Sequence, residues 1–131
     1  MDEEQIRAVI ERVCETFSNL DMSAWYACFH QPCIIIGPKG GQCLNNFEDC
    51  QRHMQPVFDR LRQQDFGRSR LDDCKIKLVG DYFAIVSAVW SRFTRDGKLI
   101  QQFGASYSFN KTDLQWKISL LTSHAKEWSM L

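Results

Sequence analysis

The amino-acid sequence predicts an α+β fold with helices in the first half of the chain and strands in the second. Up to residue 61, apolar side chains recur at intervals of three and four, the spacing of one helix face. From residue 71 the apolar residues form alternating or continuous runs, separated by turn signals at Gly80-Asp81 and Asp96-Gly97. Such segregation favours helices packed on one face of a curved, mostly antiparallel sheet. We expect residues 1–131 to form one domain, since domains commonly run about 100–150 residues.

Three helices are predicted. The first begins with acidic residues, which suit the positive end of the helix dipole. Asp21 can cap a short second helix, which Pro32 should end. After a buried strand at 33–36 and a glycine-rich turn, a third helix begins near Asn45 or Asn46, where Asn46 and Asp49 resemble a capping box. Pro56 should bend or split this helix. The apolar faces of the three helices carry, in order, Ile6, Val9, Ile10, Val13, Phe17 and Leu20; Met22, Trp25, Tyr26 and Phe29; and Phe47, Cys50, Met54, Val57, Phe58 and Leu61.

Four antiparallel strands are predicted after the helices, and the middle two are the most informative. Their side chains point alternately to the two faces of the sheet. We expect the face toward the helices to carry Ala84, Val86, Ala88, Trp90 and Arg92, followed on the next strand by Phe103, Ala105, Tyr107 and Phe109. The four strands occupy residues 74–79, 82–95, 99–110 and 115–125.

Composition excludes several classes of function. The 16 basic residues balance 16 acidic ones, which argues against a nucleic-acid partner. No window approaches the roughly 20 apolar residues of a membrane span, and the charged start is unlike a signal peptide. The six cysteines contain no C-x-x-C pair, so we interpret them as reduced thiols of a cytoplasmic protein. No pair of histidines or carboxylates has metal-ligand spacing, and we expect no metal and no cofactor.

The order of elements resembles the NTF2-like superfamily, whose helices and sheet form a cone. The opening stretch "IRAVIERVCETFSNLDMSAWYACFHQPCIIIGP" and the closing "WKI" strand carry this resemblance. The superfamily includes ketosteroid isomerases and SnoaL-like cyclases and dehydratases. In the isomerase branch, the resemblance would put the catalytic base at Gly37, the oxyanion tyrosine at Val13 and the oxyanion acid at Ala105. None of these side chains can transfer a proton, so ketosteroid-isomerase chemistry is not expected.

The resemblance still implies a cavity between helices and sheet. The candidate pocket residues are Tyr26, His53, Trp90, Arg92, Phe103, Tyr107 and His124. Three interpretations remain open. The pocket can hold a small apolar or aromatic ligand without catalysis; a SnoaL-like cyclase, isomerase or dehydratase can use His53, Tyr107 and Arg92 in a rearranged site; or aromatic side chains can fill the cone of a scaffold protein.

The opposite face of the sheet is predicted to be an interface. The long strand places Phe83, Ile85, Val89 and Phe93 on the face that the helices leave uncovered. A sheet that is apolar on both faces needs cover on both. We therefore expect a homodimer that packs through this convex face.

Overall fold

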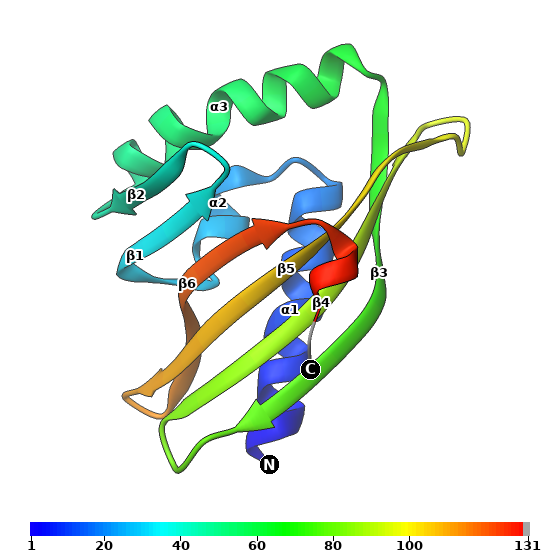
Figure 1. Ribbon diagram of the computed structural model, residues 1–131. Coiled ribbons are helices and arrows are strands. Elements are labelled where there is room, and N and C mark those ends of the chain that lie inside the picture. Colours follow the sequence, from blue (N-terminus) through cyan, green and yellow to red (C-terminus); the bar gives the residue numbers. More distant parts are fainter. Residues whose placement is uncertain (130–131) are drawn as a thin grey trace.

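The computed structural model describes residues 1–129 and shows a layer of three helices on one face of a six-stranded sheet (Figure 1). The sheet order is β2-β1-β6-β5-β4-β3, and all pairs are antiparallel except β1 with β6. This confirms the predicted α+β class. The elements are α1 (Asp2–Ser18), α2 (Met22–Tyr26), β1 (Phe29–Gly37), β2 (Gly40–Leu44), α3 (Phe47–Gln63), β3 (Phe66–Leu78), β4 (Phe83–Thr94), β5 (Leu99–Thr112), β6 (Gln115–His124) and the 3₁₀ turn η1 (Lys126–Trp128).

Side-chain caps set the starts of the two later helices. Asp21 accepts a hydrogen bond from the Ala24 backbone N–H at 3.1 Å, and Asn46 accepts one from the Asp49 N–H at 2.9 Å. Each bond satisfies an N–H that has no partner within its helix. Pro56 does not split α3, which continues to Gln63 as one helix. Both predicted caps are therefore present.

The first hairpin differs from the prediction. The second helix ends at Tyr26, and β1 begins at Phe29, four residues earlier than predicted, so Pro32 lies inside a strand and ends no helix. Phe29 pairs with Ile118 of β6, because burial in the sheet outweighs its match to the helical pattern. The glycines after β1 turn the chain into the additional strand β2, which pairs with β1 up to Gly37 and Gly40.

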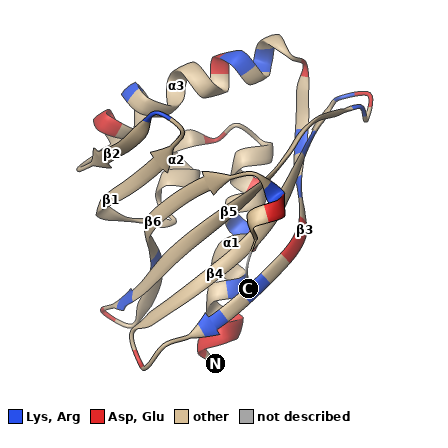
Figure 2. Cartoon of the chain, viewed as in Figure 1, with Lys and Arg blue, Asp and Glu red and all other residues tan. Residues whose placement is uncertain are grey.

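The strand β3 also begins earlier than predicted, at Phe66. Its first residues are mostly polar because this edge strand is exposed along much of its length. Figure 2 shows charged residues on β3, on α3 and near the chain start, whereas the central strands carry few. No helix within residues 1–129 is both long and apolar enough to cross a bilayer.

The core lies between the helices and the concave face of the sheet. As predicted, Ala84, Val86 and Ala88 of β4 are buried on this side. Their neighbours on β5 follow from the antiparallel register, which pairs Val86 with Tyr107 and Trp90 with Phe103. The apolar faces of the helices cover these strands and complete the core. The two strands therefore present one buried face toward the helices of the same chain.

Candidate ligand site at the mouth of the cone

The deepest of the predicted pocket residues are packed into the core. Trp90 and Tyr107 are 5% and 3% exposed, and Trp90 Nε1 donates a hydrogen bond to the Tyr107 hydroxyl at 2.9 Å. The Tyr26 hydroxyl donates to the Leu44 carbonyl at 3.3 Å. Burial raises the pKa of both tyrosines, so both stay neutral at physiological pH. These aromatic side chains fill the deep part of the cone.

The outer part of the concave side is less tightly closed. Val57 of α3, Phe103 of β5 and Leu121 of β6 are apolar side chains that pack on the core but remain partly exposed. Leu121 lies on the same face as Tyr107, because the two residues are paired across the strands. We call the region formed by Val57, Arg92, Phe103 and Leu121 the cone mouth. Its three apolar side chains are partly exposed, whereas the residues behind them are buried.

Arg92 is the charged residue of the cone mouth. Its guanidinium carbon lies 4.8 Å from the centre of the Phe17 ring and 4.6 Å from that of Phe103. Nη1 donates to Gln101 Oε1 at 3.2 Å. Burial is the main cause that lowers the pKa of Arg92 to about 10, with Tyr107 opposing this shift and the charge of Arg60 adding to it. The group therefore remains a cation at neutral pH, held between two aromatic rings.

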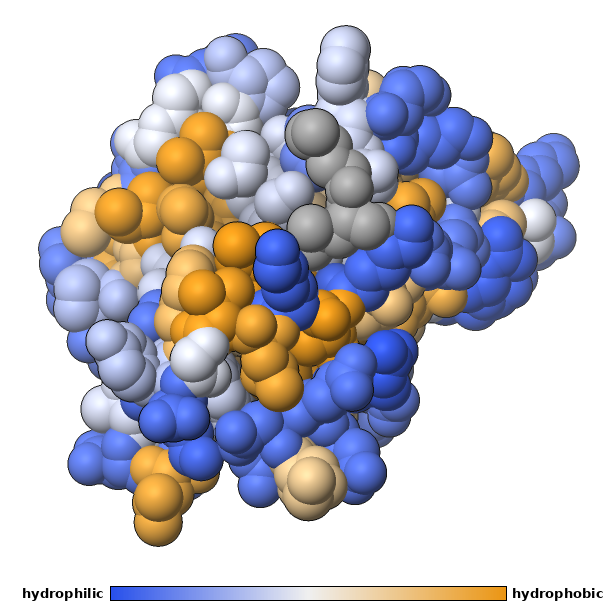
Figure 3. All heavy atoms as spheres, turned by 60° about the horizontal axis from the view of Figure 1, so that its bottom comes forward, coloured by the Kyte–Doolittle hydropathy of each residue, from blue (hydrophilic) through white to orange (hydrophobic). Residues whose placement is uncertain are grey.

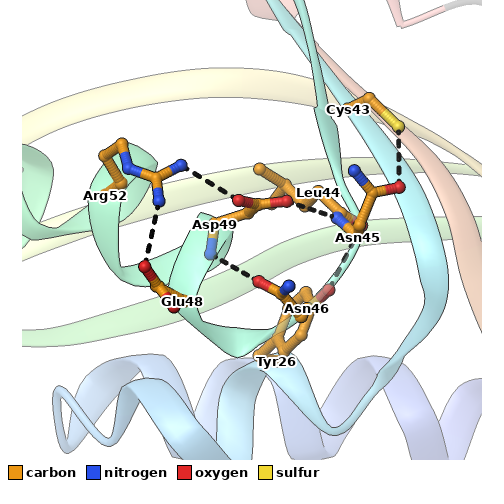
Figure 4. Close-up of polar contacts among 8 residues, drawn as sticks. All are labelled: Tyr26, Cys43, Leu44, Asn45, Asn46, Glu48, Asp49 and Arg52. Atoms are coloured by element: carbon orange, nitrogen blue, oxygen red, sulfur yellow. Dashed lines mark hydrogen bonds and ion pairs between the residues drawn. The ribbon is translucent and has the colours of Figure 1, made fainter.

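His53 lies in a separate polar hollow at the start of α3. This hollow of about 430 Å³ is lined by Gln42, Cys43, Asn45, Asp49, Arg52 and His53. Its polar groups largely bind one another: Asp49 accepts from the Asn45 N–H and from Arg52 Nη1, both at 2.9 Å (Figure 4). Burial lowers the pKa of His53. Within residues 1–129 no hydrogen bond joins His53 to Arg92 or Tyr107.

The placement of His124 in the pocket is wrong. A β-bulge in β6 leaves Ser119 unpaired between Ile118 and Leu120 and shifts the alternation of the strand. His124 consequently lies on the convex face, where Nε2 is 2.9 Å from Ser106 Oγ. Its Nδ1 is 2.8 Å from the Ala125 carbonyl. The sequence contains no clear signal for this bulge, since Ser119 also fits an unbroken strand.

A second hollow, of about 520 Å³, lies outside the cone between α1 and the β5–β6 turn. The cations Arg12 and Lys117 line it together with the buried side chains of Val9, Cys28 and Trp116. The remaining lining residues are Gln5, Ala8, Ala27, Leu114 and Gln115. This hollow was not predicted, because its residues are far apart in sequence and share no motif. Its volume is within the range of small-molecule sites.

The isomerase positions contain no acid or base. Val13 and Ala105 are buried apolar residues, and Gly37 ends β1. Within residues 1–129, the buried polar side chains are Thr16, Ser69, Ser87 and Ser91. The described chain also has no group of three or more His, Cys, Asp or Glu side chains placed to share a metal ion. The three positions that the resemblance compares with the isomerase's base, tyrosine and acid therefore carry no side chain that can transfer a proton.

Sequence reasoning missed two contacts of Arg92. The helical pattern predicts for Phe17 only a place on the apolar face of the first helix, and no pattern in the sequence predicts a role for Gln101. Gln101 pairs with Arg92 because the β4–β5 register shifts by one residue between Arg92 and Phe93, and the hairpin signal Asp96-Gly97 does not by itself fix that shift. Phe17 carries no such signal, since its approach depends on how α1 packs across the sheet.

Comparisons with known proteins agree with this architecture. An NTF2-like protein from Novosphingobium aromaticivorans superimposes with a TM-score of 0.81 at 13% identity, over 98% of this chain and 84% of that one. An NTF-2 like protein of unknown function from Shewanella oneidensis gives 0.71 at 19% identity, over 94% and 98%. A cystatin-like protein of unknown function from Nostoc punctiforme gives 0.73 at 14%, over 93% and 89%.

At such identities these structures establish the fold alone. A comparison with curated protein sequences gives no match. The sequence profile of one family, described as NTF2-like protein (DUF6841), matches residues 2–126, which is nearly the whole chain. The order of elements, the cone and this match agree, and the chain belongs to that NTF2-like family.

Proposed function

We propose that the chain is a single-domain, small-molecule-binding protein that holds an apolar or aromatic ligand at the cone mouth. One observation supports this most directly: Val57, Phe103 and Leu121 stay partly exposed on the concave side, while the deep core behind them is sealed. Apolar surface that a folded protein leaves accessible in a concave place is typical of ligand sites. The missing acid–base residues at the isomerase positions favour binding over isomerase catalysis.

A thermal-shift screen of small aromatic compounds tests this proposal. A compound present at one hundred times its dissociation constant stabilises the folded state by about 2.7 kcal/mol, which is readily measured. We expect the compounds that stabilise the wild type to lose their effect on Phe103→Ala. Phe83→Ala is the matched control, because it removes the same side chain from the convex face of the sheet.

Two results would contradict ligand binding at the cone mouth. One is a screen in which no aromatic compound stabilises the wild type. The other is a set of compounds that still stabilise Phe103→Ala but no longer stabilise Phe83→Ala, because that result would place the site on the convex face.

We further propose that the chain forms a homodimer through the convex face. Ile34, Ile85, Val89 and Leu120 lie on this face and are partly or well exposed. Figure 3 views the side that carries the C-terminal segment and shows a hydrophobic area bordered by hydrophilic side chains. Such an area is typical of an interface between protein subunits.

The free state of all six cysteines supports a reducing, cytoplasmic location.

Sedimentation equilibrium tests the dimer. We expect a dimeric wild type and a monomeric Ile85→Glu variant, since a carboxylate in the middle of an apolar interface has no partner. Leu114→Glu is the control, because Leu114 is exposed in the β5–β6 turn, away from the sheet face. A wild type that sediments as a monomer at all concentrations would rule out the dimer.

A further inference from the structure

We propose that the ligand of the cone mouth carries a carboxylate, which pairs with Arg92. This inference rests on the proposed function and adds the chemical class of the ligand to it. The argument begins with the hydrogen bonds of Arg92. A guanidinium has five N–H donors, and within residues 1–129 the structure gives it one hydrogen bond, to the neutral Gln101 side chain.

The positions of Phe17 and Phe103 decide where a ligand can approach. Both rings lie within 5 Å of the guanidinium carbon and so occupy space around the group that water would otherwise fill. The N–H groups point along the edge of the guanidinium plane, which leaves the edge as the place for an acceptor. A carboxylate matches that edge with two parallel hydrogen bonds, and an aromatic ligand body can lie beside Phe103.

The charges near Arg92 favour an anion. No carboxylate forms an ion pair with Arg92 or Arg60 in the part of the chain from 1 to 129. Asp59, the nearest acidic residue along α3, pairs instead with Arg62 at 3.4 Å. A cation that is largely removed from water is costly unless an opposite charge or hydrogen-bond acceptors compensate it. A bound carboxylate would supply both.

The outer hollow contains the competing pair of cations. Arg12 and Lys117 line it, and within residues 1–129 neither forms an ion pair. They differ from Arg92 in their surroundings, because within residues 1–129 no aromatic ring stacks on the Arg12 guanidinium or the Lys117 ammonium. An experiment must therefore separate an anion bound at the cone mouth from one bound in this hollow.

Calorimetric titration with matched acid and alcohol probes makes that separation. The probes are 2-naphthoate, indole-3-acetate and decanoate, each with the corresponding primary alcohol, and the proteins are wild type, Arg92→Gln, Arg92→Lys and the double variant Arg12→Gln/Lys117→Gln. For at least one pair we expect the wild type to bind the acid about tenfold more tightly than the alcohol, or more. Arg92→Gln should abolish this preference, Arg92→Lys should keep part of it, and the double variant should keep all of it.

The results that would contradict the inference differ from those that would contradict the proposed function. Equal affinity for acid and alcohol in the wild type overturns the inference and leaves the proposed function standing. Loss of the preference in the double variant, with retention in Arg92→Gln, also overturns it by placing the anion in the outer hollow. No binding of any probe contradicts both proposals. If Arg92→Gln does not fold, Arg92→Lys and the double variant decide: the preference for the acid must be reduced in Arg92→Lys and unchanged in Arg12→Gln/Lys117→Gln.

Discussion

The two faces of β4 and β5 come from alternating residues of the same strands, yet they are completed in different ways. On the concave face, Val86, Ala88 and Phe109 are sealed by helices of the same chain. On the convex face, the partly exposed Ile85 and Val89 alternate with the buried serines Ser87 and Ser91. The comparison shows that the concave face is buried by apolar packing within the chain, whereas the convex face combines polar contacts with apolar side chains that stay partly exposed.

Those polar contacts connect the convex face to the C-terminal segment. Asp72 accepts hydrogen bonds from Arg70 at 2.6 Å, from Gln102 at 3.1 Å and from Ser91. Gln102 in turn accepts from Lys126 of η1 at 2.5 Å. Desolvation by itself raises the pKa of Asp72. The hydrogen bonds that Ser91, Arg70 and Gln102 donate outweigh it and hold this pKa below the ordinary value. In the proposed homodimer, the second copy would therefore pack beside η1.

The largest effect should come from emptying the concave core. We expect Phe109→Ala to lower the free energy of unfolding by about 3–5 kcal/mol, because a fully buried ring leaves a cavity. Phe83→Ala removes the same ring from the convex face, where it is partly exposed, and should cost under about 2 kcal/mol. Urea unfolding of both variants, held monomeric by dilution, measures the difference. Equal losses would show that the two faces are not sealed differently.

A smaller effect should follow from removing one hydroxyl on each face. Tyr107→Phe leaves the buried Trp90 Nε1 without its acceptor, and we expect a loss of about 1–3 kcal/mol in unfolding free energy. Ser106→Ala removes the hydrogen bond to His124 on the convex face, where water can replace it, and should cost under about 1 kcal/mol. A larger loss for Ser106→Ala would mean that the convex polar contacts stabilise the fold more than the core pair does.

How much of this could be predicted depended on whether the signal was local. The α+β class, the caps at Asp21 and Asn46 and the inward residues of β4 follow from spacing within one element, and the structure confirms them. The hairpin β1–β2, the bulge at Ser119 and the contact of Phe17 with Arg92 depend on residues that meet only in the folded chain. For the same reason, the sequence placed His53 and Arg92 in one pocket, although the polar hollow that His53 lines does not include Arg92.

The smallest expected effect concerns pH and His53, which lines the polar hollow at the start of α3. Burial lowers the pKa of His53 below its ordinary value of 6.5, so the folded state binds a proton less readily than the unfolded chain. The stability that the neutral His53 side chain contributes to the folded state is therefore fully present above pH 6.5, and it is lost as the pH falls below that value. We expect the stability loss between about pH 7 and pH 5 to be smaller in His53→Gln than in the wild type, by urea unfolding. An unchanged pH slope would show that His53 is solvated in the folded protein.

The central claim is that the ligand binds on the concave side, at the cone mouth, and its most direct test is chemical-shift mapping with 2-naphthoate on ¹⁵N-labelled protein. The account predicts the largest amide shift changes at Arg92, Phe103 and Leu121. Changes concentrated at Arg12 and Lys117, or at Ile85 and Ser106, would contradict it, because they would place the ligand in the outer hollow or on the convex face.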